Sequence, residues 1–138
     1  MRDVLISRAT TPHSLTFGSL GIATPRPLAL IEQRVIPGTR LAAYGHGDWN
    51  DSMQPADRAQ ADRLCSAWTV TLHHQVLDTL ARALRRIGRD AEAQALEDEA
   101  RDVLADFQRL RVADGVVAGY AQFEPCSERR LLLHPQDD

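Results

Sequence analysis

The 138-residue sequence contains no lysine, so its positive charge comes from 16 arginines alone. Nineteen acidic residues outweigh them and give a formal net charge of −3. Domains that bind nucleic acid usually gather a basic excess on one face, whereas here the arginines are interleaved with acids along the whole chain. The composition therefore argues against a partner with a phosphate backbone, and we expect no nucleic-acid partner.

Cysteine and long apolar runs are also scarce. Cys65 and Cys126 are far apart and form no CxxC spacing, which argues against a disulfide framework and against a thiolate zinc site. We expect two free thiols. The apolar run near the N-terminus covers only residues 4–6, too short for a signal-peptide core or a membrane span. The sequence therefore predicts a cytoplasmic protein that is not bound to a membrane.

The whole sequence has 43% hydrophobic and 25% charged residues, which is the composition of one globular domain with an apolar core. Residues 1–27 are rich in proline and glycine and show no sustained pattern, so we predict irregular structure there. Residues 28–35 favour a short helix that ends at Pro37-Gly38, because proline disfavours helix in the residue before it. A loop is predicted for residues 39–57.

Two amphipathic helices follow. Residues 59–87 predict a long helix of nearly seven turns, with Asp57 as N-cap and Gly88 after its end. Asp90 is predicted to cap a second helix, and the short turn between the two makes an antiparallel αα-hairpin. The expected core residues recur at three- or four-residue steps, in the first helix Leu64, Trp68, Leu72, Val76, Leu80, Leu84 and Ile87, and in the second Ala93, Leu96, Ala100, Val103, Leu104 and Phe107.

Beyond residue 110 the pattern changes again. Asp114-Gly115 indicates a turn, and Val116, Val117 and Tyr120 favour extended structure. We therefore predict a mainly α fold with an irregular N-terminus and a short extended segment near residues 115–124.

The densest cluster of functional residue types is the loop 44–52, YGHGDWNDS, before the long helix. Its glycines permit tight turns, its indole offers a stacking face, and Asp48 and Asp51 can meet different environments and so acquire different pKa values. An aromatic ring beside carboxylates suits a carbohydrate site. A turn in which Asp48 or Asp51 caps a helix and Trp49 fills the core remains an alternative.

A metal site fits this loop poorly. Asp48, Asn50 and Ser52 alternate as calcium ligands would, but an EF-hand loop starting at Asp48 needs glycine at position 53 and glutamate at position 59. Met53 and Ala59 stand there instead. The histidines lack the HExxH spacing of a zinc site. We expect neither a metal nor an organic cofactor.

The string YGHGDWNDSMQPAD, followed by SAWTVTL, DGVVAGYAQFE and LLLHPQD, resembles the catalytic-barrel region of glycoside hydrolase family 94, the inverting glycoside phosphorylases. That family includes enzymes resembling cellobiose phosphorylase and cyclic β-1,2-glucan synthase. Ser52 with Gln54-Pro55 is more similar to the β-1,2-oligoglucan phosphorylase branch. The resemblance covers residues 31–137, whereas residues 1–30 form an unmatched leader. It implies that residues 31–138 are part of an (α/α)6 barrel.

By position, the resemblance implies that Asp51 is the general acid and that Trp49 lines the sugar subsites. Asp48 either raises the pKa of Asp51 or holds the loop. Asp48, Asn50 and His46 are further substrate-binding candidates. His46 and Tyr44 either border the sugar site or are packing residues. Inorganic phosphate would be the co-substrate, because in an inverting phosphorolysis it replaces the second carboxylate of a hydrolase. The partners implied are thus a β-linked oligosaccharide and phosphate.

The family's phosphate-binding residues lie downstream of the matched region, and Arg129-Arg130 is the nearest candidate here. We therefore expect an inactive fragment, with self-association through exposed barrel-facing helices. The alternative is a non-catalytic helical-hairpin interaction module, because ALRRIGRDAEAQALEDEA resembles the turn of tetratricopeptide-like repeats. No second copy at a 34-residue period supports it.

Overall fold

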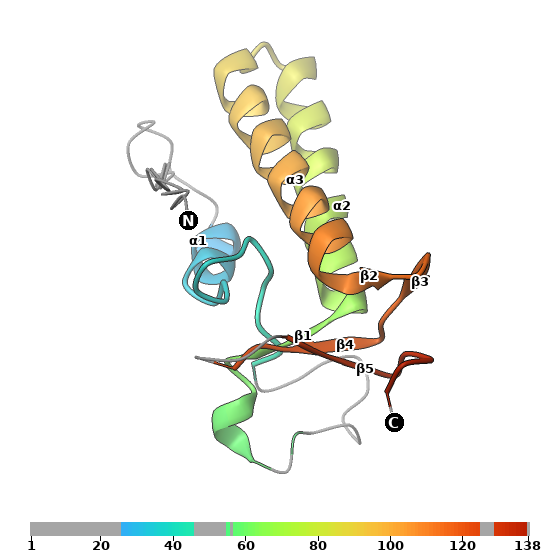
Figure 1. The fold of residues 1–138 in the computed structure, drawn as a ribbon. Coiled ribbons are helices and arrows are strands. Elements are labelled where there is room, and N and C mark those ends of the chain that lie inside the picture. Colours follow the sequence, from blue (N-terminus) through green and yellow to red (C-terminus); the bar gives the residue numbers. More distant parts are fainter. Residues whose placement is uncertain (1–25, 46–54, 56, 125–128, 138) are drawn as a thin grey trace, which may run out of the picture.

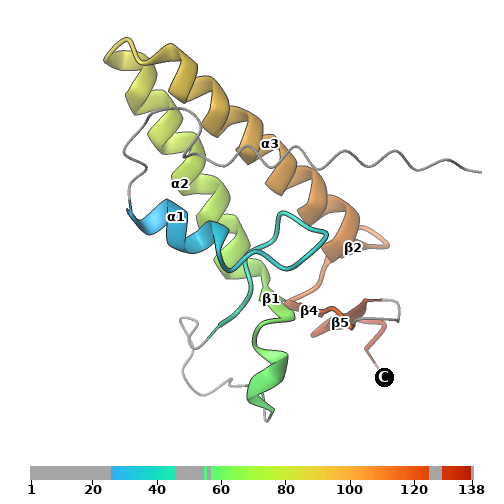
Figure 2. The same ribbon diagram turned by 90° about the vertical axis from the view of Figure 1, so that its left-hand side faces the viewer.

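The computed structural model describes residues 26–45, 55, 57–124 and 129–137. This part of the chain is mainly helical, as expected, with a small sheet. Two long antiparallel helices, α2 (Ala67–Arg86) and α3 (Asp90–Arg111), form a hairpin that stands on strands β1, β4 and β5 (Figure 1). The third helix, α1 (Arg26–Glu32), lies beside the hairpin near its open end (Figure 2). The described residues contain one pair of long helices, and one pair cannot close an (α/α)6 barrel. The barrel therefore remains a prediction.

Helix α2 is shorter than predicted. Residues 64–66 form strand β1 (Leu64–Ser66), and a single 3₁₀ turn, η2 (Arg58–Gln60), precedes it. Ser66 has extended backbone angles, and its side chain accepts a hydrogen bond from the backbone N–H of Thr69, so Ser66 is the N-cap. The prediction that the helix starts near residue 59 with Asp57 as its cap was wrong.

The predicted inner face of α2 was also wrong. The residues that are buried against the rest of the fold are Val70, His73, Leu77 and Ala81. Trp68, Leu72 and Val76, which were expected in the core, are instead 52%, 42% and 48% exposed. Of the predicted stripe, the members in α2 that pack against the core are Leu80 and Leu84. Helix α2 therefore carries apolar side chains on two different faces.

Helix α3 matches its prediction closely. It starts at Asp90, follows the left-handed Gly88 (φ 75°), and buries Ala93, Leu96, Ala100 and Val103 against α2. Two details differ. Arg89 occupies the N-cap position without a side-chain capping bond, and Leu104 is 41% exposed. The antiparallel αα-hairpin is thus confirmed.

The end of α3 leads into two small sheets. Strands β2 (Val112–Ala113) and β3 (Val116–Val117) pair around Asp114 and Gly115, whose φ angles of 49° and 76° belong to a type I′ turn. Strand β4 (Tyr120–Gln122) lies between β1 and β5 (Arg130–Leu132), antiparallel to both. The predicted turn and the extended segment near residues 115–124 are therefore confirmed.

Helix α1 begins two residues earlier than predicted and ends at Glu32 rather than at position 35. Residues 26 and 27, which were expected to be irregular, are helical. A tight turn with Gly38 in the left-handed region (φ 79°) follows, closed by the bond from Ile36 N–H to the Leu41 carbonyl, 2.9 Å. Leu28 and Ile31 attach α1 to the core.

One buried apolar cluster joins these parts. It contains residues of α1, the turn after it, both long helices and the sheet, among them Leu28, Ile36, Leu41, Val70, Leu77, Val103 and Ala121. A second, smaller cluster of Tyr44, Leu64 and Tyr120 lies on the sheet. Among the described helices, none is both long and apolar enough to cross a membrane.

Candidate functional site

The five residues with the strongest functional prediction lie outside the described residues. They are His46, Asp48, Trp49, Asn50 and Asp51, all within the segment 46–54. The structure does describe the two points at which this segment joins the fold, Tyr44-Gly45 before it and residues 55 and 57–63 after it. Both flanking stretches make hydrogen bonds within the described fold.

The first attachment is made on strand β1. The backbone N–H of Tyr44 donates to the Leu64 carbonyl at 2.6 Å, and that of Gly45 donates to the Ala61 carbonyl at 3.1 Å. The Tyr44 ring is 3% exposed and packs against Tyr120 of β4 with a centroid distance of 5.9 Å. The Tyr44 side chain is thus part of the hydrophobic packing on the sheet.

Gly45 is a position that no other residue can fill without strain. Its φ is 68°, and a Cβ atom there would lie 3.2 Å from Nη1 of Arg34. The residue directly after the buried Tyr44 therefore has a backbone conformation that favours glycine.

The second attachment is a polar turn. Asp57 accepts a hydrogen bond from the Ala59 backbone N–H through Oδ1 at 2.9 Å, and its carbonyl accepts one from Gln60 N–H at 3.0 Å. Asp57 therefore caps the short turn η2 rather than the long helix. The chain then passes Arg63, whose carbonyl accepts from Phe123 N–H at 2.8 Å, and enters β1. Both ends of the loop are consequently fastened to one sheet.

Arg111, which no sequence pattern singles out, lies against this sheet. Arg111, the last residue of α3, is completely buried. Its guanidinium donates to the carbonyl and thiol of Cys65 in β1, and to the carbonyls of Ala118 and Gly119 at 2.6 and 2.7 Å. Arg111 thus ties the end of the hairpin to β1 and to the chain entering β4.

The partners of Arg111 make it a structural group rather than an anion site. They are backbone carbonyls and a sulfur, and its ring neighbour is Phe107, at 5.9 Å from the guanidinium carbon. Burial raises the pKa of the Cys65 thiol, although the nearby Arg111 works in the opposite direction. Cys65 is therefore a protonated, free thiol, and it is not an activated nucleophile.

The arginine pair named as a phosphate candidate is engaged with the protein itself. Arg129 donates through Nε to the Leu110 carbonyl at 2.9 Å. Arg130 lies 3.4 Å from Oδ1 of Asp137 in the C-terminal turn. Both contacts hold β5 in place, so nothing in their geometry favours phosphate binding.

Charged residues connect helix α3 with the turn that follows α1. Arg40 donates its backbone N–H to Asp106 at 2.7 Å and places Nη1 3.5 Å from Glu99. Burial raises the pKa of Glu99, and the carboxylate of Asp102 adds to this, while Arg40 opposes it. Burial and the charge of Glu99 raise the pKa of Glu32, an effect that solvent weakens because Glu32 is exposed. These contacts hold the turn after α1 against α3.

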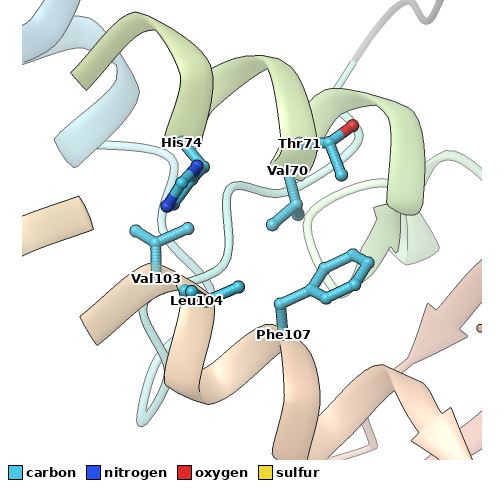
Figure 3. A pocket seen from close by; sticks show the side chains of 6 residues that line it. All are labelled: Val70, Thr71, His74, Val103, Leu104 and Phe107. Carbon is cyan, nitrogen blue, oxygen red and sulfur yellow. The ribbon is translucent and has the colours of Figure 1, made fainter. Parts of the chain in front are cut away.

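A small cavity of about 90 Å³ opens between the two long helices. Val70, Thr71 and His74 of α2 face Val103, Leu104 and Phe107 of α3 across it (Figure 3). Ligand sites usually have volumes of roughly 300 Å³ or more and several convergent polar groups. This apolar gap is therefore no sugar site.

His73 makes stability depend on pH. It is buried, and its Nδ1 has no hydrogen-bond partner. Burial, and next the charge of His74, lower the pKa of His73 from 6.5. Above pH 6.5 the imidazole is neutral in both states and has no effect. Below pH 6.5 the imidazole of His73 is protonated in the unfolded chain but stays neutral in the native chain. The free energy of unfolding therefore falls with falling pH until the pH reaches the native pKa of His73.

We expect His73→Leu to remove this slope in urea titrations between pH 5.5 and 7.5, and His74→Gln to keep most of it. The raised pKa values of Glu32 and Glu99 act with the opposite sign, and both groups are present in the natural chain and in the variants, so the difference between the curves isolates position 73. An unchanged slope in His73→Leu would contradict the assignment.

Within the described ranges, no group of three or more histidine, cysteine, aspartate or glutamate side chains could hold a metal ion. No protein-family model matches the sequence. The chain is 35% identical over 108 residues, 78% of its length, to a 1,2-beta-oligoglucan phosphorylase of Listeria innocua. It spans only 9% of that enzyme. The chain is thus similar to a short part of a glycoside phosphorylase.

Proposed function

We propose that this chain carries the general-acid loop of an inverting glycoside phosphorylase of glycoside hydrolase family 94, acting on β-1,2-linked gluco-oligosaccharides. The observation that carries the proposal is the 35% identity to a 1,2-beta-oligoglucan phosphorylase. The segment Gly47-Asp48-Trp49-Asn50-Asp51 supports it. So does the way in which both ends of the loop are fastened to the β1–β4–β5 sheet.

Each residue of the loop has a chemical task in this proposal. By resemblance, Asp51 matches the carboxyl that in a complete phosphorylase donates its proton to the glycosidic oxygen as the bond to the anomeric carbon breaks, while phosphate attacks that carbon from the opposite face. The acid must be protonated beforehand, and a negative charge on the neighbouring Asp48 would raise its pKa. Trp49 stacks on a sugar ring, and Asn50 and His46 bind hydroxyl groups.

Sugar binding and phosphorolysis are separable in this chain. The described arginines nearest the C-terminus hold β5, and Arg111 is enclosed by backbone carbonyls. A nucleophile that is not positioned reacts slowly, whatever the quality of the acid. We therefore propose that the chain binds the oligosaccharide without cleaving it, and that it works in a reducing compartment, the cytoplasm, where Cys65 stays a free thiol.

The first test is thermal unfolding with β-1,2-linked gluco-oligosaccharides, with and without phosphate. A ligand that binds only the native state at ten times its Kd stabilises it by about 1.4 kcal/mol. We expect that shift in the natural chain, and its loss in Asp51→Asn and Trp49→Ala. Asp62→Asn changes an exposed aspartate of the turn after η2 and should keep it.

Two comparisons make this test specific. A β-1,4-linked glucan of equal length should give a smaller shift. Release of glucose 1-phosphate, measured in parallel, should stay at background. The proposal fails if the β-1,2-linked sugar gives no shift, or if the shift is equal in Asp51→Asn, Trp49→Ala and the natural chain.

A second candidate is a non-catalytic interaction module, and the exposure of Trp68, Leu72 and Val76 on α2 favours it. Large apolar side chains in a row on a surface helix commonly mark a protein interface. This function requires no sugar binding. Association that persists in Asp51→Asn, together with no response to any oligosaccharide, would favour it over the phosphorylase proposal.

A further inference from the structure

The outer face of α2 carries a stripe of five uncharged side chains, here called the outer stripe, and the exposed Arg86 follows it on the same face at the end of the helix. At 100° per residue its members fall within about 80° of the helix circumference. Its three large members are between two fifths and just over half exposed, and its two small ones are exposed as well. The outer stripe consists of Trp68, Leu72, Val76, Thr79 and Ala83.

This face differs from an ordinary solvent-facing helix surface. The neighbouring exposed positions Thr71 and Gln75 are also uncharged. Asp78 and Arg82 lie to one side and neutralise each other at 2.8 Å. The opposite side of α2 already packs on the core through Val70 and Leu77. A helix that is apolar on two sides is typical of one that is covered on both.

The order of residue sizes along the outer stripe suits a particular partner. The bulky Trp68 and Leu72 lie near the start of α2, and the small Thr79 and Ala83 lie near its end. If a second α2 runs antiparallel and crosses near position 75, Trp68 meets Ala83 of the second copy and Leu72 meets its Thr79. Large side chains then face small ones at both ends, as close packing requires.

We propose that the outer stripe docks a second copy of this chain, with α2 packed antiparallel against α2 about a two-fold axis near Gln75 and Val76. Such an interface is isologous, so each complementary pair occurs twice. The antiparallel arrangement also sets opposite helix dipoles side by side. This inference does not depend on the sugar-binding proposal.

The size of the surface sets the expected affinity. A 20-residue helix is about 30 Å long, and we expect pairing along it to bury an area near the lower limit of about 1,000 Å² for specific association. We therefore expect a dimer with a Kd in the micromolar range rather than the nanomolar range. With a Kd of tens of micromolar, the natural chain should sediment mostly as a monomer at about 1 µM and mostly as a dimer at roughly 200 µM.

The matched variants are Leu72→Arg and Leu104→Arg. Both leucines are exposed to nearly the same degree, 42% and 41%, but Leu104 lies on α3, away from the outer stripe. We expect Leu72→Arg to weaken dimerisation at least about tenfold, since it buries a charge at the interface. Leu104→Arg should sediment like the natural chain. Unfolding of both variants at low concentration verifies that each is folded.

Disulfide cross-linking tests the orientation. In a Cys126→Ser background, Gln75→Cys places thiols beside the proposed axis and should give a cross-linked dimer on mild oxidation. Ala83→Cys should not, because antiparallel pairing puts the two copies of position 83 at opposite ends of the interface. Equal cross-linking at position 83 would overturn the antiparallel geometry. A chain that remains monomeric at the highest concentration would overturn the proposal and assign the outer stripe to a different protein segment.

Discussion

Replacing Arg111 by methionine is expected to lower the free energy of unfolding by about 3 kcal/mol. Methionine fills much of the same volume but cannot donate a hydrogen bond. The carbonyls of Cys65, Ala118 and Gly119 would each lose a donor in the buried interior, and Gly119 would keep its bond from Ala67 N–H. Each unsatisfied group costs roughly 1–3 kcal/mol, and relief from burying a charge offsets part of the sum.

Arg109→Met is the matched control, because it removes an arginine from the same last turn of α3. Arg109 is exposed and pairs only with Asp106 on its own helix, so its loss should cost less than about 1 kcal/mol. Arg111→Lys keeps the charge but cannot reach three carbonyls at once, and it should recover less than half of the loss. Urea titration of all three variants measures these values. Equal stability of Arg111→Met and Arg109→Met would show that the buried hydrogen bonds are not needed.

Leu77→Ala is the second substitution with a large expected effect, about 3 kcal/mol. Leu77 is 1% exposed and lies in the core cluster with Val70, Leu96 and Val103. Truncation removes a buried isobutyl group and leaves a cavity that the two helices can close only in part.

Leu72→Ala provides the comparison, since both leucines stand on α2. Leu72 is 42% exposed, and at concentrations where the chain is monomeric its truncation should cost less than about 1 kcal/mol. Urea unfolding of both variants decides which face of α2 packs inward. If Leu72→Ala were the more damaging change, the face chosen from the periodicity of the sequence would be the buried one after all.

The sequence predicted α3 well because that helix has one clear apolar face. Ala93, Leu96, Ala100 and Val103 recur at helical spacing, and charged residues fill the other side. Helix α2 offers two apolar stripes of similar strength, one through Trp68 and Leu72 and the other through Val70 and Leu77. Periodicity cannot rank two such stripes, because the choice depends on what packs against them.

Strand β1 was missed for a related reason. Leu64 falls in phase with the leucines of α2, so its spacing continues the helical pattern into a segment that is extended. Ser66 offered the one local signal, since serine is a common N-cap and starts the helix there. The pairing of β1 with β4 is a long-range contact, and local patterns do not contain it.

The candidate site, too, was predicted only in part. The chemistry of Trp49 and Asp51 was predicted from residue type and resemblance, and both lie outside the described residues. Their anchors, Tyr44 on Tyr120 and Gly45 on Ala61, could not be predicted, because they depend on the position of the sheet. Arg111 gave no signal, since arginine is rarely buried and is usually expected on the surface.

The attachment of β1 and β4 to the two ends of the helical hairpin has a consequence for the order of folding. Helices α2 and α3 are neighbours in sequence, so their contacts form at low entropic cost. Once they are paired, the bond from Ala67 N–H to the Gly119 carbonyl brings the ends of the hairpin together. Strand β1 can then pair with β4 without closing a long flexible chain. We therefore expect the hairpin to act as a nucleus for the sheet, and the residues that flank the segment with Asp51 to pack in the last stage.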